Sequence, residues 1–147
     1  MFDKKDLAII EVLKHNSNLS TQQISKKTKI PITTVHNRIK KLEKSGIIKE
    51  YTILLDNKKI GKAIAAYILI TVDYKLLNEQ KMSQNDLAKK LKSIPDVEEA
   101  SVLTGAADII IKVRVSDIDQ LNEFVTKQLR NIGGVEKTQT AVILNEA

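Results

Sequence analysis

The chain has 147 residues, of which 42% are hydrophobic and 29% charged, a balance typical of a globular protein with one or two small domains. It contains no cysteine and only two histidines, His15 and His36, so we expect neither a disulfide framework nor a structural metal. No run approaches the roughly 18 apolar residues of a membrane span, and the acidic start lacks a secretory pattern. These features predict a cytoplasmic protein without a membrane partner.

Positive charge is concentrated in the first part of the chain. Residues 1–62 contain 14 Lys or Arg against 6 Asp or Glu, a net charge of +8. Residues 63–147 contain 10 against 12, a net charge of −2. This asymmetry indicates a part that binds a polyanion joined to a part with another role, although chance clustering of lysines would give the same counts.

Residues 2–29 carry the signals of two helices. Asp3 stands where the N-cap of the first helix is expected, and Asn16 stands near its end. Ser20 and Gln23 have the spacing of a capping box, which predicts that a short second helix begins there. The residues expected on the buried face of the first helix are Leu7, Ile10 and Leu13.

The stretch PITTVHNRIKKLEKSG, residues 31–46, predicts a third helix. Pro31 suits the turn before a helix, and Gly46 can adopt the left-handed conformation that ends one. Apart from Glu43, its outward residues are cationic or hydrogen-bonding, which fits a DNA-binding surface but also a plain solvated helix. The apolar residues expected on its buried stripe are Ile32, Val35, Ile39 and Leu42.

The neighbouring helices favour the DNA-binding alternative. Three helices within 45 residues, the last two joined by a tight turn, predict a helix-turn-helix unit whose last helix enters the major groove. The N-terminal residues of such a helix reach deepest, so we expect base-edge contacts there and phosphate contacts farther along. The predicted base-edge residues are Thr33, Thr34, His36, Asn37 and Arg38, and the predicted phosphate contacts are Lys40, Lys41 and Lys44.

A linker follows the helix-turn-helix unit. Residues 47–56 alternate loosely between apolar and polar side chains and predict a strand, and the turn signal DNKKIG comes next. We therefore expect a DNA-binding domain at residues 1–48 and a strand and hinge at 49–62.

The remainder, residues 63–147, predicts the order strand, helix, strand, strand, helix, strand. This is a ferredoxin-like βαββαβ domain, so the predicted fold class of the chain is α+β. Its helices are expected at about 82–94, with Ser83 as the cap, and at about 117–132, with Ile118 and Leu121 among the inward-facing residues. The sheet would have one face without helices, and apolar residues on both sides of its strands indicate that a second copy of the chain covers that face.

Together these features resemble the leucine-responsive regulatory protein (Lrp/AsnC) family of transcription regulators. The likeness spans almost the whole chain. It rests on the R-I-x-x-L-E-x-x-G-I-I pattern from Arg38 to Ile48, the following Tyr51, the hairpin VLTGAADIIIKVRV and the final strand VEKTQTAVIL.

The resemblance implies a homodimer paired through its sheets, further assembly into octamers as tetramers of dimers, and an amino-acid effector bound between dimers. The implied partners also include double-stranded DNA with an imperfect palindrome and the transcription machinery. Relatives contact the effector through a Gly-x-x-Asp turn and the final strand, and this chain has Ala106 and Ala107 where some relatives have polar or aromatic residues. The implied effector-binding residues are Gly105, Ala106, Ala107, Asp108, Thr138 and Thr140.

The sequence shows no catalytic set and no site for a cofactor. It has no nucleophile with an evident base, no phosphate-binding glycine loop and no cluster of metal ligands, so we do not expect an enzyme. Two alternatives stay open beside a sequence-specific regulator: an architectural DNA-binding protein of low sequence specificity, and an amino-acid-binding protein without a promoter target. The +8 charge of the first part argues against the second alternative.

Overall fold

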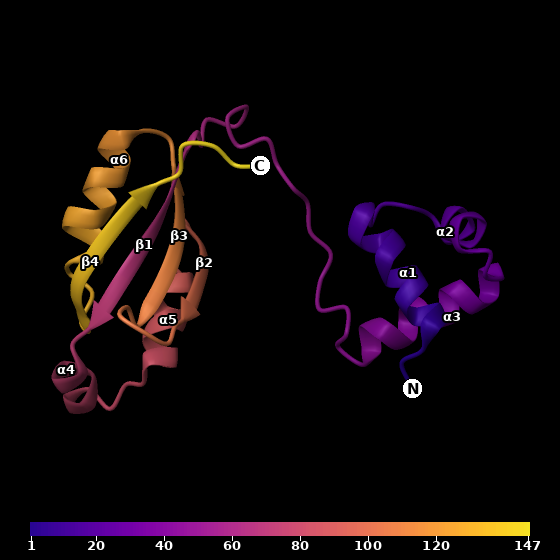
Figure 1. Cartoon of the computed structure of the whole chain (residues 1–147), viewed down its shortest axis with the longest axis horizontal. Helices are drawn as coiled ribbons and strands as arrows, with labels where there is room; N and C mark the ends of the chain where they lie inside the picture. Colours follow the sequence, from indigo (N-terminus) through magenta and orange to yellow (C-terminus); the bar gives the residue numbers. More distant parts are fainter. The chain divides into compact units, whose positions relative to one another are not determined.

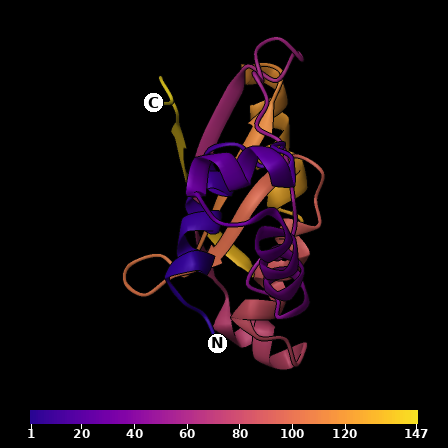
Figure 2. The same ribbon diagram turned by 90° about the vertical axis from the view of Figure 1, so that its right-hand side faces the viewer.

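The computed structural model describes residues 1–147, and the chain divides into two compact units, Met1–Leu54 and Leu55–Ala147. The predicted three-helix unit is confirmed, and its helices lie together in both views (Figures 1 and 2). Side chains of Asp3 and Ser20 cap the first two helices as predicted, and Gly46 follows the third with φ +76°. The helices are α1 (Lys4–His15), α2 (Thr21–Thr28) and α3 (Ile32–Lys44).

The first unit has a small apolar core, and two of the residues predicted to lie in it are exposed instead. Leu7 and Ile32 were expected inside but are 49% and 48% exposed. On α1, the inward position beside Ile9 is taken by Asp6, which is completely buried, so the buried stripe is rotated away from Leu7. Ile32 begins α3, ahead of the turns that face the core. The buried apolar residues of this unit are Ile9, Ile24, Ile30, Val35 and Leu42.

The strand predicted at residues 47–56 is absent from the structure. This segment has no regular secondary structure, and a turn follows it at residues 57–61. A strand needs a neighbour to satisfy its backbone N–H and C=O groups, and nothing within this single chain pairs with the segment. Its side chains are correspondingly exposed, to 74% at Ile53 and 99% at Leu54.

The second unit contains the predicted βαββαβ arrangement as an antiparallel sheet with strand order β2–β3–β1–β4 (Figure 1). A short helix that the sequence did not predict, α4, follows β1, and α6 continues into a wider π-helical stretch, η1. Gly134 has φ +101°, and a Cβ atom there would lie 2.7 Å from Leu77 Cδ2, so a side chain would force Leu77 to shift. The bounds are β1 (Ile64–Val72), α4 (Tyr74–Glu79), α5 (Gln84–Lys92), β2 (Val97–Val102), β3 (Ile109–Val115), α6 (Ile118–Glu123), η1 (Phe124–Leu129) and β4 (Val135–Val142).

One face of the sheet packs against α5 and α6 and forms the larger core. Alternate residues of β1 and β3 point into it, as a two-residue period requires, and meet the buried side chains of the helices. Ile118, predicted to face inward, is 55% exposed because the helix turns Leu121 and Phe124 to the sheet instead. Central members of this core are Ile68, Ile70, Ile109, Ile111, Leu87, Leu91, Phe124 and Leu129.

The other face of the sheet, here called the open face, mixes apolar and charged side chains. Arg114 is only 8% exposed and is bonded by Glu98 and by Glu146 from the carboxyl-terminal tail, whose carboxylate also lies 2.8 Å from Lys112 Nζ. These cations lower the pKa of Glu146 to about 2. None of the helices combines the length and hydrophobicity needed to cross a bilayer. The open-face residues of the two central strands are Ala65, Tyr67, Leu69, Ile110, Lys112 and Arg114.

Candidate functional site

The outer side of α3 presents an uninterrupted stripe of polar and cationic side chains. Thr33, Asn37, Lys40 and Lys44 follow one another in steps of four, three and four residues, which aligns them on one face of a helix. All four are exposed, and so is His36 beside them. None of the ion pairs of the chain includes Lys40 or Lys44. The stripe is therefore available to an external polyanion.

The opposite side of α3 is anchored in the three-helix core. Val35 and Leu42 are completely or almost completely buried, Ile39 packs against the core, and Thr34 is half-buried. Glu43, the single acid of α3, accepts a hydrogen bond from the Tyr51 hydroxyl at 2.7 Å. Burial and this contact raise the pKa of Tyr51 to about 12. The acid of α3 is thus engaged within the unit.

Two predicted DNA contacts, Arg38 and Lys41, point toward the beginning of α1. Arg38 Nη1 lies 2.6 Å from Asp3 Oδ2 and 3.3 Å from each carboxylate oxygen of Asp6. Lys41 Nζ donates to the Met1 carbonyl at 2.6 Å and lies 4.0 Å from Asp6 Oδ2. The Arg38 guanidinium and two backbone N–H groups lower the pKa of Asp3 to about 2. The sequence predicted that all the cations of α3 contact DNA, Arg38 at base edges and the lysines at phosphates, whereas the structure directs Arg38 and Lys41 toward α1.

The turn between β2 and β3 holds the other predicted site. It projects beyond the sheet as an orange loop in Figure 2, with Gly105 at φ +107°. Asp108 closes it, because the Leu103 N–H donates to the Asp108 carbonyl at 2.8 Å. The Asp108 carboxylate accepts from the Val72 N–H at 2.9 Å and from the Tyr74 hydroxyl at 2.7 Å. The Tyr74 hydroxyl and then the Val72 N–H lower the pKa of Asp108, so its carboxylate is ionised at neutral pH.

The predicted residues of the final strand lie on the far side of β1 from Asp108. The Asp108 N–H donates to the Ile70 carbonyl at 2.9 Å, whereas Thr138 of β4 is paired with Ile70 from the other side. Thr140 is paired with Ile68, two residues along, and is exposed. Within one chain, therefore, β1 separates Asp108 from Thr138 and Thr140.

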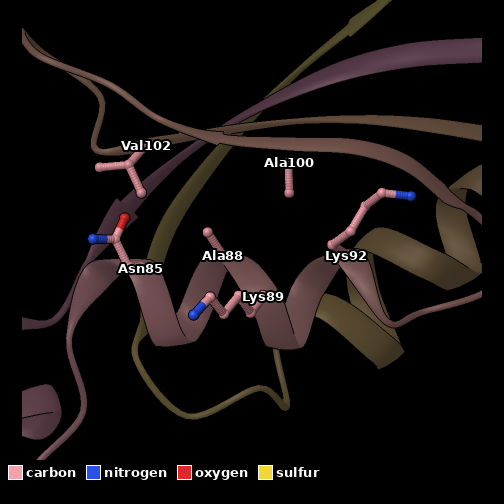
Figure 3. Close-up of a pocket in the computed structure, with 6 residues that line it drawn as sticks. All are labelled: Asn85, Ala88, Lys89, Lys92, Ala100 and Val102. Atoms are coloured by element: carbon pink, nitrogen blue, oxygen red, sulfur yellow. The ribbon is translucent and has the colours of Figure 1, made fainter. Parts of the chain in front are cut away.

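A cleft of about 470 Å³ lies between α5 and β2 (Figure 3). Ala88 on the helix and Ala100 on the strand point toward each other across it, and Lys89 and Lys92 extend from the helix (Figure 3). No acidic side chain lines it. One end adjoins the Asp108 turn, because Gln84, next to Asn85 of the cleft, places its Nε2 3.4 Å from Asp108 Oδ1. Two ammonium groups over an apolar floor suit a small anion with a short apolar part.

Each of the two units matches a known sequence family. Residues 2–49 match a family described as winged helix-turn-helix DNA-binding, and residues 65–147 match the Lrp/AsnC ligand binding domain. An HTH-type transcriptional regulator of Pyrococcus horikoshii is 37% identical over 142 residues, 97% of this chain and 92% of that protein. Another, from Pyrococcus furiosus, is 33% identical over 144 residues, 98% of this chain and 90% of that protein.

Solved structures match the whole chain as well. A transcriptional regulator of Neisseria meningitidis in complex with L-Met has a TM-score of 0.89 at 25% identity, covering 99% of this chain and 92% of that one. The AsnC protein of E. coli has a TM-score of 0.83 at 26% identity, covering 99% and 94%. These structures therefore share both units with this chain, in the same order along the sequence.

Proposed function

We propose that a homodimer of this chain reads an imperfect DNA palindrome through its two α3 helices. The chain belongs to the Lrp/AsnC family of DNA-binding transcription regulators. The observation that carries this proposal is the exposed stripe of α3, which has cationic and hydrogen-bonding groups along its length and no acid. Side chains of this kind bond base edges and phosphates in the major groove.

The residues of α3 divide between two kinds of DNA contact. Thr33, His36 and Asn37 stand near the beginning of the helix, with the half-buried Thr34 between them, and we assign base edges to this group. Lys40 and Lys44 lie farther along the same stripe without an acidic partner, and we assign phosphates to them. Arg38 and Lys41 point away from this stripe, toward the beginning of α1.

A homodimer accounts for surfaces that a single chain leaves without partners. Residues 47–56 expose apolar side chains and form no strand, and the open face exposes 39% of Tyr67. Pairing with a second copy would satisfy both. A two-fold dimer presents its α3 helices to half-sites one helical turn of DNA apart, about 34 Å, or a multiple of it. Further assembly into octamers is part of the same proposal.

DNA binding is tested by fluorescence anisotropy with a fragment from upstream of the gene of this protein, titrated with random competitor DNA. Specific binding should survive a large excess of competitor, and the affinity should fall steeply with salt. If each subunit neutralises about four phosphates, the log–log slope for the dimer is roughly −7. Binding that the competitor abolishes would favour the architectural alternative.

For the effector we propose an amino acid bound where the Asp108 turn meets the cleft between α5 and β2. Asp108 is ionised, and its Oδ2 atom accepts from one protein donor only, the Val72 N–H, so it still has a lone pair for an ammonium group. Lys89 stands on the cleft side of α5, where it can meet a carboxylate. The regulator of Neisseria meningitidis named as an L-Met complex supports the class of ligand. Gly105, Ala106 and Ala107 would shape the turn, and Thr138 and Thr140 would come from another subunit.

The effector site is tested by calorimetry against the common amino acids, with and without DNA. Asp108→Asn and Lys89→Gln should each weaken the heat signal, whereas Lys90→Gln, the neighbouring exposed lysine that does not line the cleft, should leave it unchanged. Equal effects of Lys89→Gln and Lys90→Gln would remove the cleft from the site. No heat with any amino acid would contradict the proposal.

The proposed role of the chain is that of a regulator without enzymatic activity. The curated relatives are named as transcription regulators, and we assign no catalytic role and no cofactor to this chain. A regulator of chromosomal promoters acts in the cytoplasm and meets the transcription machinery there. Residues 1–48 serve as the DNA-binding domain, 49–62 as the linker and 63–147 as the effector and oligomerisation domain.

A further inference from the structure

The direction of Arg38 raises a question about its role in DNA recognition. It lies in the middle of α3, next to Asn37, where a guanidinium would suit a guanine or a phosphate. Only 25% of its side chain is exposed, however, and its Nη1 atom bonds Asp3 and Asp6. The positive charge of Arg38 is therefore already paired with carboxylates inside the first unit.

Asp6 makes this arrangement hard to leave. Its side chain is completely buried, and a buried carboxylate is costly unless a cation and hydrogen bonds compensate it. The cations near it are Arg38 at 3.3 Å and Lys41 at 4.0 Å, and one of its oxygens also accepts from the Asp3 N–H at 2.9 Å. If Arg38 swung out to DNA, Asp6 would lose its nearer cation. The contact with α1 therefore competes with any contact to DNA.

The same network fixes the rotation of α3. Arg38 and Lys41 are three residues apart and lie on one side of the helix, where they bond Asp3 and Met1, the residues just before α1. Lys40 and Lys44 lie on the outward stripe. Each residue of a helix is turned by 100° from the one before, so even a modest rotation of α3 would exchange the side chains that face the DNA.

We propose that Arg38 is a positioning residue, which holds α3 against the beginning of α1 through Asp3 and Asp6 and so sets which side chains face DNA. This inference rests on the proposed role of α3 in reading DNA. Arg38 acts on recognition without touching the nucleic acid, and Asp6, an acid with no access to DNA, is as important for affinity as Arg38.

The sign of one substitution separates positioning from direct contact. Asp6→Asn keeps the size of the side chain, removes one negative charge and leaves Arg38 with Asp3 as its only acidic partner. If Arg38 contacts DNA directly, this change leaves affinity the same or higher; if it positions α3, affinity falls. The matched control is Glu11→Gln, which removes one negative charge from the same helix at an exposed residue whose side chain bonds only Lys14.

The experiment measures anisotropy of the full chain on the specific fragment and on a scrambled duplex over a range of salt. We expect Asp6→Asn and Arg38→Gln to weaken specific binding about ten-fold with an unchanged salt slope, and Arg38→Lys to restore most of it. Glu11→Gln should bind like the wild type. Circular dichroism confirms folding, and if Asp6→Asn is unfolded, Asp3→Asn replaces it with the same expectation, because Asn also caps helices well.

Other outcomes overturn the inference. An Asp6→Asn chain that binds as tightly as Glu11→Gln would show that Arg38 is free to contact DNA or is unimportant. A slope reduced by about 0.9 per subunit in Arg38→Gln would identify a phosphate contact, and a base preference lost in Arg38→Lys would identify a base contact. A wild type that prefers neither duplex would overturn the proposed function itself, a result distinct from these.

Discussion

The two units of the chain are stabilised in different ways. The core cluster of the first consists of four buried apolar residues and is supplemented by the Asp3, Asp6 and Arg38 network. The cluster of the second contains sixteen, and its most buried ion-paired cation, Arg114, lies outside that cluster on the open face. In the first unit, charges are part of the interior and orient the helix that reads DNA. Its structure should therefore respond to core and charge changes more sharply than that of the second.

The largest effect is expected from Ile9→Ala. Removing a completely buried side chain costs about 2 to 5 kcal/mol, which is comparable to the roughly 3 to 8 kcal/mol that stabilises a unit of this size. The first unit should unfold, with loss of DNA binding, while the second stays folded. Proton–nitrogen NMR spectra would show this as selective loss of dispersed signals. Loss of both sets together would mean that the two units do not fold separately.

A smaller effect is expected from Gly134→Ala in the second unit. A Cβ atom there would lie 2.7 Å from Leu77 Cδ2, and the backbone has φ +101°, so the change should cost about 1 to 3 kcal/mol. The control is Gly61→Ala, which shares a positive φ but has nothing within 4 Å. Urea denaturation should show the greater loss for Gly134→Ala. Equal losses would mean that backbone strain alone matters.

Acid should weaken each unit, and the carboxylate whose pKa is lowered most is Asp3 in the first unit and Glu146 in the second. In the folded chain the pKa of Asp3 is about 2 instead of 3.8, and that of Glu146 is about 2 instead of 4.5. Each carboxylate contributes stability above its ordinary pKa, and this contribution is lost as the pH falls through the folded pKa. Stability should therefore fall between about pH 4.5 and pH 2.

Substituting each carboxylate shows which unit loses stability in acid. Asp3→Asn should flatten the pH dependence of the first unit and Glu146→Gln that of the second, when urea denaturation is measured across this pH range. A dependence that keeps its steepness in both variants would trace the acid sensitivity to other carboxylates.

The smallest effect is expected from Lys44→Gln, which removes one exposed charge from the outward stripe of α3. Affinity should fall to a similar degree on specific and random DNA, and the salt slope should become shallower by about 0.9 per subunit. Lys75→Gln, an exposed lysine in the second unit, serves as the control and should change neither quantity. A change limited to the specific site would make Lys44 a base contact.

Local signals in the sequence predicted the local features of the fold. Asp3, Ser20 and Ser83 cap their helices because a short polar side chain can bond the free N–H groups of the first turn, which needs no distant partner. The βαββαβ order followed from hydrophobic periodicity in the same way. The prediction of a strand at residues 47–56 was wrong because a strand needs a second strand to pair with, and the sequence pattern of one segment does not reveal whether such a partner exists.

The candidate site depended more on distant contacts. Asp6 was not expected inside because charged residues are rarely buried, and its partner Arg38 is 32 residues away along the chain. Likewise, the bond of Asp108 to Tyr74 depends on the short helix α4, which has too few residues for a clear period. The outward stripe of α3 was predictable because it lies within one helix. The division of its cations between α1 and DNA was not.

The central claim, that α3 reads bases, is tested most directly by comparing the wild type with Asn37→Ala on the specific fragment and on a scrambled duplex of equal length. The wild type should bind the specific fragment about a thousand-fold or more tightly than the scrambled one. Asn37→Ala should lose about 1 to 3 kcal/mol on the specific fragment and nothing on the scrambled duplex. An equal loss on both duplexes would contradict base reading by this helix.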